Sequence, residues 1–93
     1  MIRSFADVET ARLFDTRKSR RLPPDIRKRT IMRLGQLQAA TRLEDLRLPP
    51  SNRLEALKGE RSGQHAIRIN DQWRGGFCFR DGNAFDIEIT DYH

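Results

Sequence analysis

The spacing of apolar residues changes a little past the middle of the chain, from a helical repeat to strict alternation. Between residues 8 and 14 apolar side chains recur at every third position, which predicts a short amphipathic helix with Asp7 as its N-cap. A longer helix is expected over residues 24–40, because this segment begins at a proline and keeps helical spacing. A single helical turn is expected over residues 41–46, and an extended loop over residues 49–52.

Alternating apolar and polar residues predict β-strands in the second part of the chain and a short strand at its start. The expected strands cover residues 2–5, 54–57, 65–70, 73–80 and 84–90. The Asp81-Gly82 pair is typical of a tight hairpin turn. In the last strand Phe85, Ile87 and Ile89 are expected to share one face. The predicted fold class is α+β, with an N-terminal strand and two helices packed on one face of a small antiparallel sheet and a polar open face opposite.

Length and composition narrow the classes of protein. A chain of 93 residues predicts one domain spanning residues 1–93. The chain has one cysteine, Cys78, so the sequence gives neither an internal disulfide framework nor a zinc-type ligand cluster, and no metal or cofactor is expected. It lacks both a run of about 18 apolar residues and the apolar core of a signal peptide. We therefore expect a cytoplasmic protein without a membrane segment.

The basic residues are unevenly distributed. The net charge is +5, and residues 1–48 carry 12 of the 18 basic side chains against 6 acidic ones. Such an excess predicts an anionic partner, which could be nucleic acid, an anionic surface or an acidic protein, although basic residues on a helix are also commonly a solvated surface. In the loop of residues 16–21, four of the six side chains are basic. The candidates for contact with phosphates, and so for binding RNA if the partner is a nucleic acid, are Arg17, Lys18, Arg20, Arg21, Arg27, Lys28 and Arg68.

Polar side chains on neighbouring strands and at the chain end could support phosphodiester cleavage. These candidates are Glu55, Lys58, Arg68, Arg74, Asp91, Tyr92 and His93. RNA cleavage needs a base for the 2′-OH proton, cations to offset charge on the phosphorane and an acid for the leaving 5′-oxygen. Lys58 and Arg74 could supply positive charge, and His93 could act as acid or base. The same residues could equally be an ordinary solvated sheet face, since no familiar enzyme signature accompanies them.

Three segments together resemble the HigB branch of the RelE/ParE toxin superfamily: residues 53–59 (Arg-Leu-Glu-Ala-Leu-Lys-Gly), residues 62–74 with their Asn-Asp-Gln-Trp-Arg end, and the terminal Asp-Tyr-His of residues 91–93. The first five residues, the length and the order of elements are also similar to that branch. The resemblance implies a toxin of a type II toxin–antitoxin pair that cuts mRNA in the ribosomal A site without a metal. The 2′-OH would attack the adjacent phosphate and leave a 2′,3′-cyclic phosphate.

The same resemblance implies roles for individual residues. Lys58 and Arg74 would bind the scissile phosphate. Asp91 would orient or assist proton transfer, Tyr92 would position the substrate, and His93 would be the general acid or base. The basic loop and helices would rest on ribosomal RNA. The implied partner is a HigA-like helix-turn-helix antitoxin, which would inhibit the toxin and bind operator DNA in the complex.

The chain departs from this family pattern at two places. Glu55 stands where some relatives carry histidine, so a carboxylate would replace an imidazole there. Gly75 and Gly76 stand where relatives tend to have larger apolar residues, and each glycine should weaken the strand by about 0.5–1 kcal/mol. Two other functions stay open from the residues alone. One is a ParE-like toxin that binds DNA gyrase; the other is a non-catalytic RNA-binding module.

Overall fold

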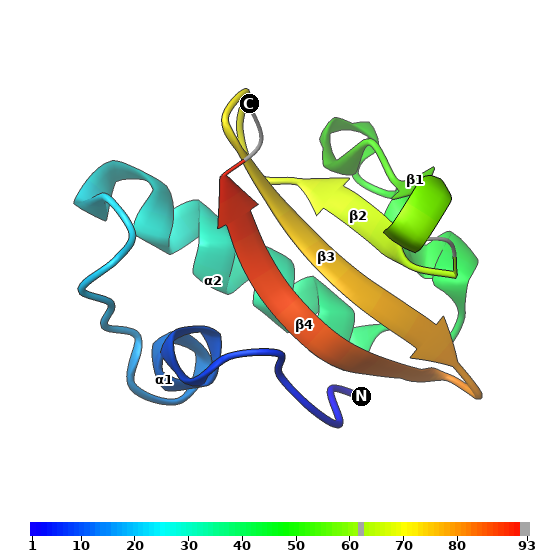
Figure 1. The fold of residues 1–93 in the computed structure, drawn as a ribbon, viewed down its shortest axis with the longest axis horizontal. Helices are drawn as coiled ribbons and strands as arrows, with labels where there is room; N and C mark the ends of the chain where they lie inside the picture. Colours follow the sequence, from blue (N-terminus) through cyan, green and yellow to red (C-terminus); the bar gives the residue numbers. More distant parts are fainter. Residues whose placement is uncertain (62, 92–93) are drawn as a thin grey trace.

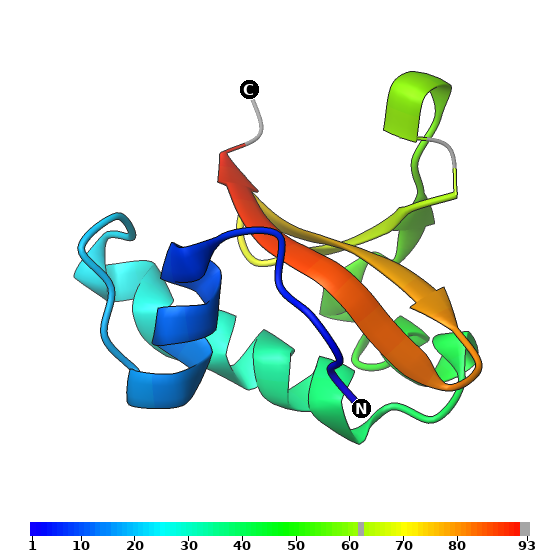
Figure 2. The same cartoon turned by 60° about the horizontal axis from the view of Figure 1, so that its bottom comes forward.

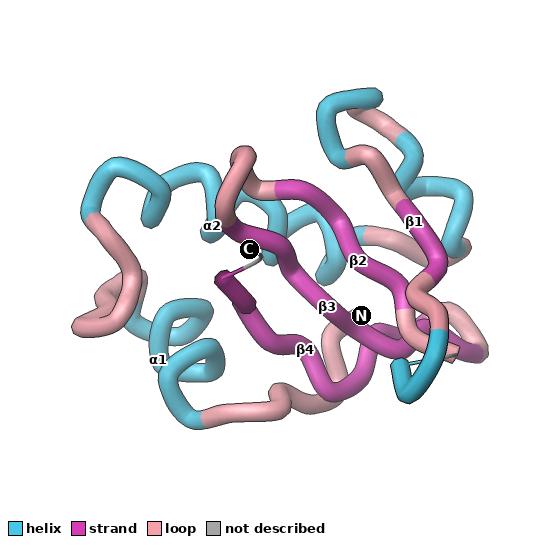
Figure 3. Tube along the Cα trace, turned by 45° about the horizontal axis from the view of Figure 1, so that its top comes forward, coloured by secondary structure: helices cyan, strands magenta, loops and turns pink. Residues whose placement is uncertain are grey.

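The computed structural model describes residues 1–61 and 63–91, and within these ranges it contains two α-helices and one four-stranded sheet. The helices are α1 (Val8–Thr16) and α2 (Pro24–Ala39), and the strands are β1 (Glu55–Ala56), β2 (His65–Arg68), β3 (Trp73–Arg80) and β4 (Asn83–Asp91). Neighbouring strands are antiparallel in the order β1-β2-β3-β4, so the sheet is a meander (Figure 1; Figure 3). The predicted α+β class is confirmed.

The helices cover one face of the sheet and leave the other open. Figure 2 shows α1 and α2 below the sheet, whereas the loop of Gly59–Arg61 and the end of β4 rise above it. Leu34 and Leu37 of α2 belong to the same buried cluster as Ile67, Phe77 and Ile89 of the sheet. Burial of these side chains is the main favourable contribution to folding. It also fixes which face of each strand remains available for function.

The predicted helices form nearly where the sequence placed them. Asp7 caps α1, because its carboxylate accepts a hydrogen bond from the backbone N–H of Thr10 at 2.7 Å. The second helix begins at Pro24, as expected for a proline in the first turn. Val8 belongs to the apolar repeat of α1 but is 72% exposed, and Leu13 is the apolar side chain of that helix that is fully buried.

The segment at residues 49–52 is a correction to the sequence prediction of an extended loop. Residues Pro50–Asn52 form a short 3-10 helix that begins at a proline. The Asn52 side chain is buried and donates hydrogen bonds to the carbonyl oxygens of Leu46 and Leu48, at 3.1 and 3.3 Å. These contacts favour the turn over an extended loop.

The expected N-terminal strand exists only as isolated bridges to β4. Ile2 and Phe5 make parallel bridges to Ala84 and Ile87. Between these bridges Asp86 adopts a left-handed conformation with φ +52°, and its N–H donates to the Ser4 hydroxyl at 2.9 Å. The irregular backbone of β4 at this point prevents a continuous ladder with residues 2–5.

The same irregularity makes the prediction of a common face for Phe85, Ile87 and Ile89 wrong. Cys78 pairs with Phe85, whereas Gly76 pairs with Glu88, so β4 contains one extra residue between the two pairs. This β-bulge reverses the alternation of side chains. Ile87 and Ile89 are buried on the core face, while Phe85 lies on the opposite face with the Arg80 guanidinium 4.1 Å from its ring centre.

Gly75 lies in the core-facing row of the sheet, between Ile67 and Ile89. A Cβ atom added at Gly75 would lie 3.7 Å from both Ile67 Cγ1 and Ile89 Cδ1, which is ordinary van der Waals contact. Gly75→Ala is therefore expected to raise the free energy of unfolding by about 1 kcal/mol, because alanine has less backbone freedom to lose and buries a methyl group. Urea unfolding measures this change through the transition midpoint.

Gly82 provides the matched control. It has φ +77°, and a Cβ there would lie 3.1 Å from the Thr41 carbonyl oxygen. Gly82→Ala should therefore lower stability, because both the backbone conformation and the close contact oppose a side chain. If Gly75→Ala and Gly82→Ala lost equal amounts of stability, Gly75 would be shown to be needed for packing.

Candidate functional site

Arg74 occupies the centre of one row of side chains on the open face. It pairs with Arg68 on β2 and with Thr90 on β4. Directly paired residues of antiparallel strands point to the same face, so these three side chains are neighbours there. One Arg74 Nη donates to the carbonyl oxygen of Asn70 at 2.6 Å, which directs the guanidinium along the end of the sheet where β2 turns into β3.

The β2–β3 turn that accepts this hydrogen bond is also held by α2. Arg33 Nε donates to the carbonyl oxygen of residue 68 at 2.9 Å, and Arg29 Nη1 donates to that of residue 69 at 3.2 Å. Arg33, Arg29 and Arg74 therefore donate hydrogen bonds to three consecutive backbone carbonyls, those of residues 68, 69 and 70. Desolvation lowers the pKa of Arg33, and the nearby charges of Arg29 and Arg68 lower this pKa further. The buried cation is thus part of the support of the site.

The next row on the open face has almost no side-chain volume at its centre. Ala66 of β2 pairs with Gly76 of β3, which pairs with Glu88 of β4, and Glu55 of β1 pairs with Ala66 on the other side. Ala66 has a methyl group as its side chain and Gly76 has none. The surface of the sheet beside Arg74, which we call the floor, therefore carries almost no side-chain atoms.

A hollow of about 170 Å³ lies over this floor. Its lining residues are Leu57, Arg61, Ala66, Arg74, Gly76 and Thr90. Arg61 comes from the Gly59–Arg61 helical turn and reaches across Gly76 to Glu88, with 2.6 Å between its Nη1 and Glu88 Oε1. Sequence reasoning missed Arg61, because a charged residue in a turn with glycines resembles ordinary solvated surface.

The end of β4 lies beside this hollow. Thr90 lines it, and the following residue, Asp91, pairs with Trp73 and accepts a hydrogen bond from Gln72 Nε2 at 3.0 Å. Asp91 is exposed at the last position of β4. Tyr92 and His93, which were expected to act with Asp91, lie outside the described residues.

Neither Lys58 nor Glu55 is one of the residues that line the hollow. Lys58 is exposed, follows the lining residue Leu57 and is not itself one of the lining residues. Glu55 borders a different hollow of about 150 Å³, together with Leu43, Glu44, Arg47, Leu54, Ala56 and His65. Of the expected catalytic residues within the described part of the chain, Arg74 is the one that lines the 170 Å³ hollow.

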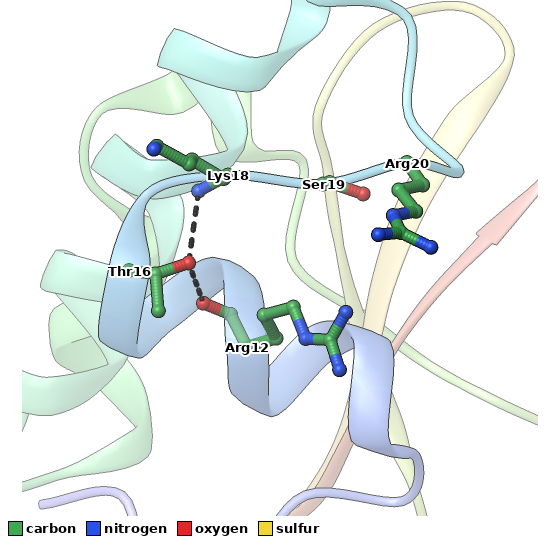
Figure 4. A pocket seen from close by; sticks show the side chains of 5 residues that line it. All are labelled: Arg12, Thr16, Lys18, Ser19 and Arg20. Atoms are coloured by element: carbon green, nitrogen blue, oxygen red, sulfur yellow. Dashed lines mark hydrogen bonds between the residues drawn. The ribbon is translucent and has the colours of Figure 1, made fainter.

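The expected RNA-binding loop borders a separate basic groove of about 510 Å³. It is lined by Arg12, Thr16, Lys18, Ser19 and Arg20. The Thr16 hydroxyl donates to the Arg12 carbonyl at 2.8 Å and accepts from the Lys18 N–H at 3.3 Å, which fixes the loop on the end of α1. In Figure 4 the guanidinium groups of Arg12 and Arg20 project to the same side. Arg12 was missed because it precedes the basic run of the sequence.

The other expected RNA contacts divide into exposed and internally bonded side chains. Arg17 and Lys28 are exposed. Arg21 donates to a backbone carbonyl of β4 at 3.0 Å, and Arg27 donates to a carbonyl just before α2 at 3.4 Å. Arg68 pairs with a carboxylate of the β2–β3 turn. Arg21, Arg27 and Arg68 therefore have structural contacts in addition to their charge.

Within residues 1–61 and 63–91, no helix is long and apolar enough to cross a membrane.

Comparisons with known proteins agree with the fold and identify relatives. The family model described as RelE-like toxin of type II toxin–antitoxin system HigB matches residues 3–93. Toxin HigB-1 of Vibrio cholerae is 39% identical over 75 residues, which cover 81% of this chain and 79% of that protein. Endoribonuclease HigB of Proteus vulgaris is 31% identical over 93 residues, and the alignment covers 100% of both proteins.

A solved structure shows the same fold at low sequence identity. The crystal structure of a YafQ mutant from E. coli aligns with a TM-score of 0.60 and 14% identity, covering 98% of this chain and 91% of that one. At this identity the match supports the arrangement of helices and strands.

Proposed function

The chain belongs to the HigB-like family of RelE-like toxins of type II toxin–antitoxin systems, and we propose that it is an endoribonuclease that cuts mRNA in the A site of translating ribosomes. The observation that carries this proposal is the position of Arg74, which lines a hollow on the open sheet face beside the end of β4. The relative from Proteus vulgaris, aligned along its whole length, is named an endoribonuclease.

In the proposed reaction the 2′-oxygen attacks the adjacent phosphorus while the bond from phosphorus to the 5′-oxygen breaks. A base takes the 2′-OH proton, and an acid gives a proton to the leaving 5′-oxygen. The products are a 2′,3′-cyclic phosphate and a 5′-OH. We assign stabilisation of the phosphorane charge to Arg74, assisted by Lys58, and acid or base chemistry to His93. Asp91 and Tyr92 would orient His93 and the substrate.

Glu55 has a weaker claim to proton transfer. Glu55 borders the hollow that Leu54 and His65 also line, whereas Arg74 lines the other one. A carboxylate can act as a base, but Glu55 is not one of the residues that line the hollow with Arg74. We therefore assign the acid–base chemistry to the chain end.

The basic groove is proposed as the contact with ribosomal RNA. Arg12, Lys18 and Arg20 place positive charge on α1 and the loop after it, while the hollow lies on the open face of the sheet. Phosphate contacts from such residues supply affinity without reading sequence. The two surfaces would thus divide the work: the groove positions the toxin, and the hollow holds the scissile phosphate.

Type II toxins of this family have an antitoxin as their counterpart. We propose that the partner here is a HigA-like helix-turn-helix protein that inhibits the toxin and carries it to operator DNA. Both would act in the cytoplasm, where translating ribosomes are found. Residues 1–93 would act as one toxin domain, with cleavage performed by side chains without a metal or cofactor.

Expression of the chain in bacteria tests this function against gyrase binding. We expect growth to stop and messages to be cut within codons, because the A site aligns the mRNA with the hollow. Message ends are mapped by sequencing total RNA shortly after induction, and a DNA-damage reporter is read in parallel. Growth arrest with an induced DNA-damage response and intact messages would contradict the proposal and favour the gyrase-binding alternative.

A further inference from the structure

Arg61 and Arg74 line the same hollow from different elements. We infer that Arg61 is a second phosphate-binding residue of this hollow and that Glu88 holds it in place until RNA enters. This inference rests on the proposed function, since it adds a residue to the proposed RNA site.

The chemistry of the lining suits a phosphodiester. Guanidinium groups bind phosphate oxygens through paired N–H donors, and a phosphodiester has two non-bridging oxygens that can accept from two guanidinium groups at once. The hollow, at about 170 Å³, is smaller than a pocket for a drug-sized molecule. Its floor of Ala66 and Gly76 offers no competing polar side chain. These properties favour a compact anion bound between two cations.

Glu88 is the anion that Arg61 contacts in the protein without RNA. The Glu88 side chain is 29% exposed and the Arg61 side chain 48%, so solvent and an incoming phosphate can reach the pair. Ion pairs this exposed typically change an equilibrium constant by less than about fivefold. A phosphate that also binds Arg74 can therefore displace Glu88 at low cost.

Gly76 allows this contact to cross the sheet. A Cβ atom at Gly76 would lie 3.7 Å from Arg61 Nη1 and 3.8 Å from Glu88 Cγ. A methyl group would fit at these distances, whereas a larger side chain would extend into the space that Arg61 and Glu88 occupy. The presence of glycine at position 76 is thus explained by the Arg61 side chain, which passes over it.

The test compares four variants on two readouts. The variants are Arg61→Ala, Arg61→Lys, Glu88→Gln and the double variant Arg61→Ala/Glu88→Gln. Arg42→Ala is the matched control, because Arg42 forms an exposed pair with Glu44 at 3.7 Å and does not line the hollow. Binding is measured by fluorescence anisotropy with a 2′-O-methyl RNA oligonucleotide over a salt series. Cleavage is measured under single-turnover conditions on ribosomes carrying mRNA, and melting curves confirm folding.

For binding, Arg61→Ala should raise the Kd at least about tenfold, because a charge-assisted contact to phosphate is lost. The slope of log K against log salt should fall by about 0.7, the value for one phosphate contact on a single strand. The Kd of Arg61→Lys should lie between those of wild type and Arg61→Ala. Lysine keeps the positive charge but lacks the paired N–H donors of the planar guanidinium.

Glu88→Gln should tighten binding by up to about fivefold, because Arg61 no longer has a charged competitor. This gain should disappear in the double variant, since Glu88 acts through Arg61. A gain that persists without Arg61 would show a general charge effect and contradict the role of Glu88.

If Arg61→Ala behaves like Arg42→Ala in both readouts, the inference is overturned while the proposed function stands. If wild type binds the oligonucleotide with the predicted Arg61 dependence but leaves ribosome-bound mRNA intact, the proposed function fails and the binding site stands. Failure of wild type to bind the oligonucleotide, combined with cleavage that is unaffected by Arg61→Ala, would also contradict the inference.

Discussion

Replacing Arg74 with alanine is expected to slow mRNA cleavage on ribosomes by about two to three orders of magnitude, the cost of removing one donor that stabilises charge in a transition state. Arg74 lines the hollow on the open face, and its guanidinium can meet the negative charge that develops on the phosphorane. The single-turnover rate at saturating toxin measures this loss directly, because it is independent of binding to the ribosome.

Two companion variants separate this role from a general effect of charge or stability. Arg74→Lys keeps the charge but loses the planar fork, so its rate should be intermediate. Arg80→Ala removes an arginine from the other end of the same strand, where the side chain stacks on Phe85. It should cleave at nearly the wild-type rate. Arg74 would lose its assigned role if both alanine variants were equally slow, or if Arg74→Ala were simply unfolded in a melting curve.

Replacing His93 with glutamine is expected to lower the cleavage rate by about two to four orders of magnitude, the usual contribution of a general acid or base. Imidazole can exchange a proton near neutral pH, whereas an amide of similar size can only form hydrogen bonds. Expression of His93→Gln should therefore no longer arrest growth, although the protein should still bind ribosomes. Ribosome pelleting and single-turnover cleavage, done on the same preparation, measure the two properties separately.

A chain that ends at Asp91 extends this prediction. Loss of residues 92–93 should remove toxicity as completely as His93→Gln, since both lack the imidazole. Undiminished growth arrest by the shortened chain would mean that the chain end takes no part in catalysis. The chemistry would then have to come from the side chains of the sheet itself.

Local features of the sequence were sufficient to predict most of the fold. Asp7 is an N-cap by side-chain chemistry, and Pro24 begins a helix because its fixed φ suits the first turn. The tight turn at Asp81-Gly82 needs positive φ at both residues, 52° and 77° in the structure. An Asp-Gly pair adopts such angles readily, so the turn could be predicted from these two residues. Each of these signals depends on residues close together in the chain, so a single sequence contains the information.

Features that depend on distant residues were not predictable in the same way. The bulge at Asp86 turns Phe85 to the open face, and the Asp86 N–H in it donates a hydrogen bond to the hydroxyl of Ser4, 82 positions away. Alternation along β4 alone therefore gave the wrong face for Phe85. Alternation predicts side-chain direction only where a strand has no extra residue.

The candidate site shows the same division. Arg74 could be singled out because it belongs to a recognisable Trp-Arg segment on a predicted strand. Arg61 could not, because its proximity to Arg74 arises when the turn of Gly59–Arg61 folds over Gly76 and meets Glu88. Arg12 likewise joins the basic groove only when the loop after α1 folds back onto the helix.

Primer extension on a defined mRNA in a purified translation system tests the central claim most directly. Purified wild-type protein is added to ribosomes paused with a known codon in the A site, and the ends of the cut message are analysed chemically. The account predicts a cut within the A-site codon that leaves a 2′,3′-cyclic phosphate and a 5′-OH. The cut should require ribosomes and be nearly lost with Arg74→Ala. An intact message, or equal cutting of the same RNA without ribosomes, would contradict it.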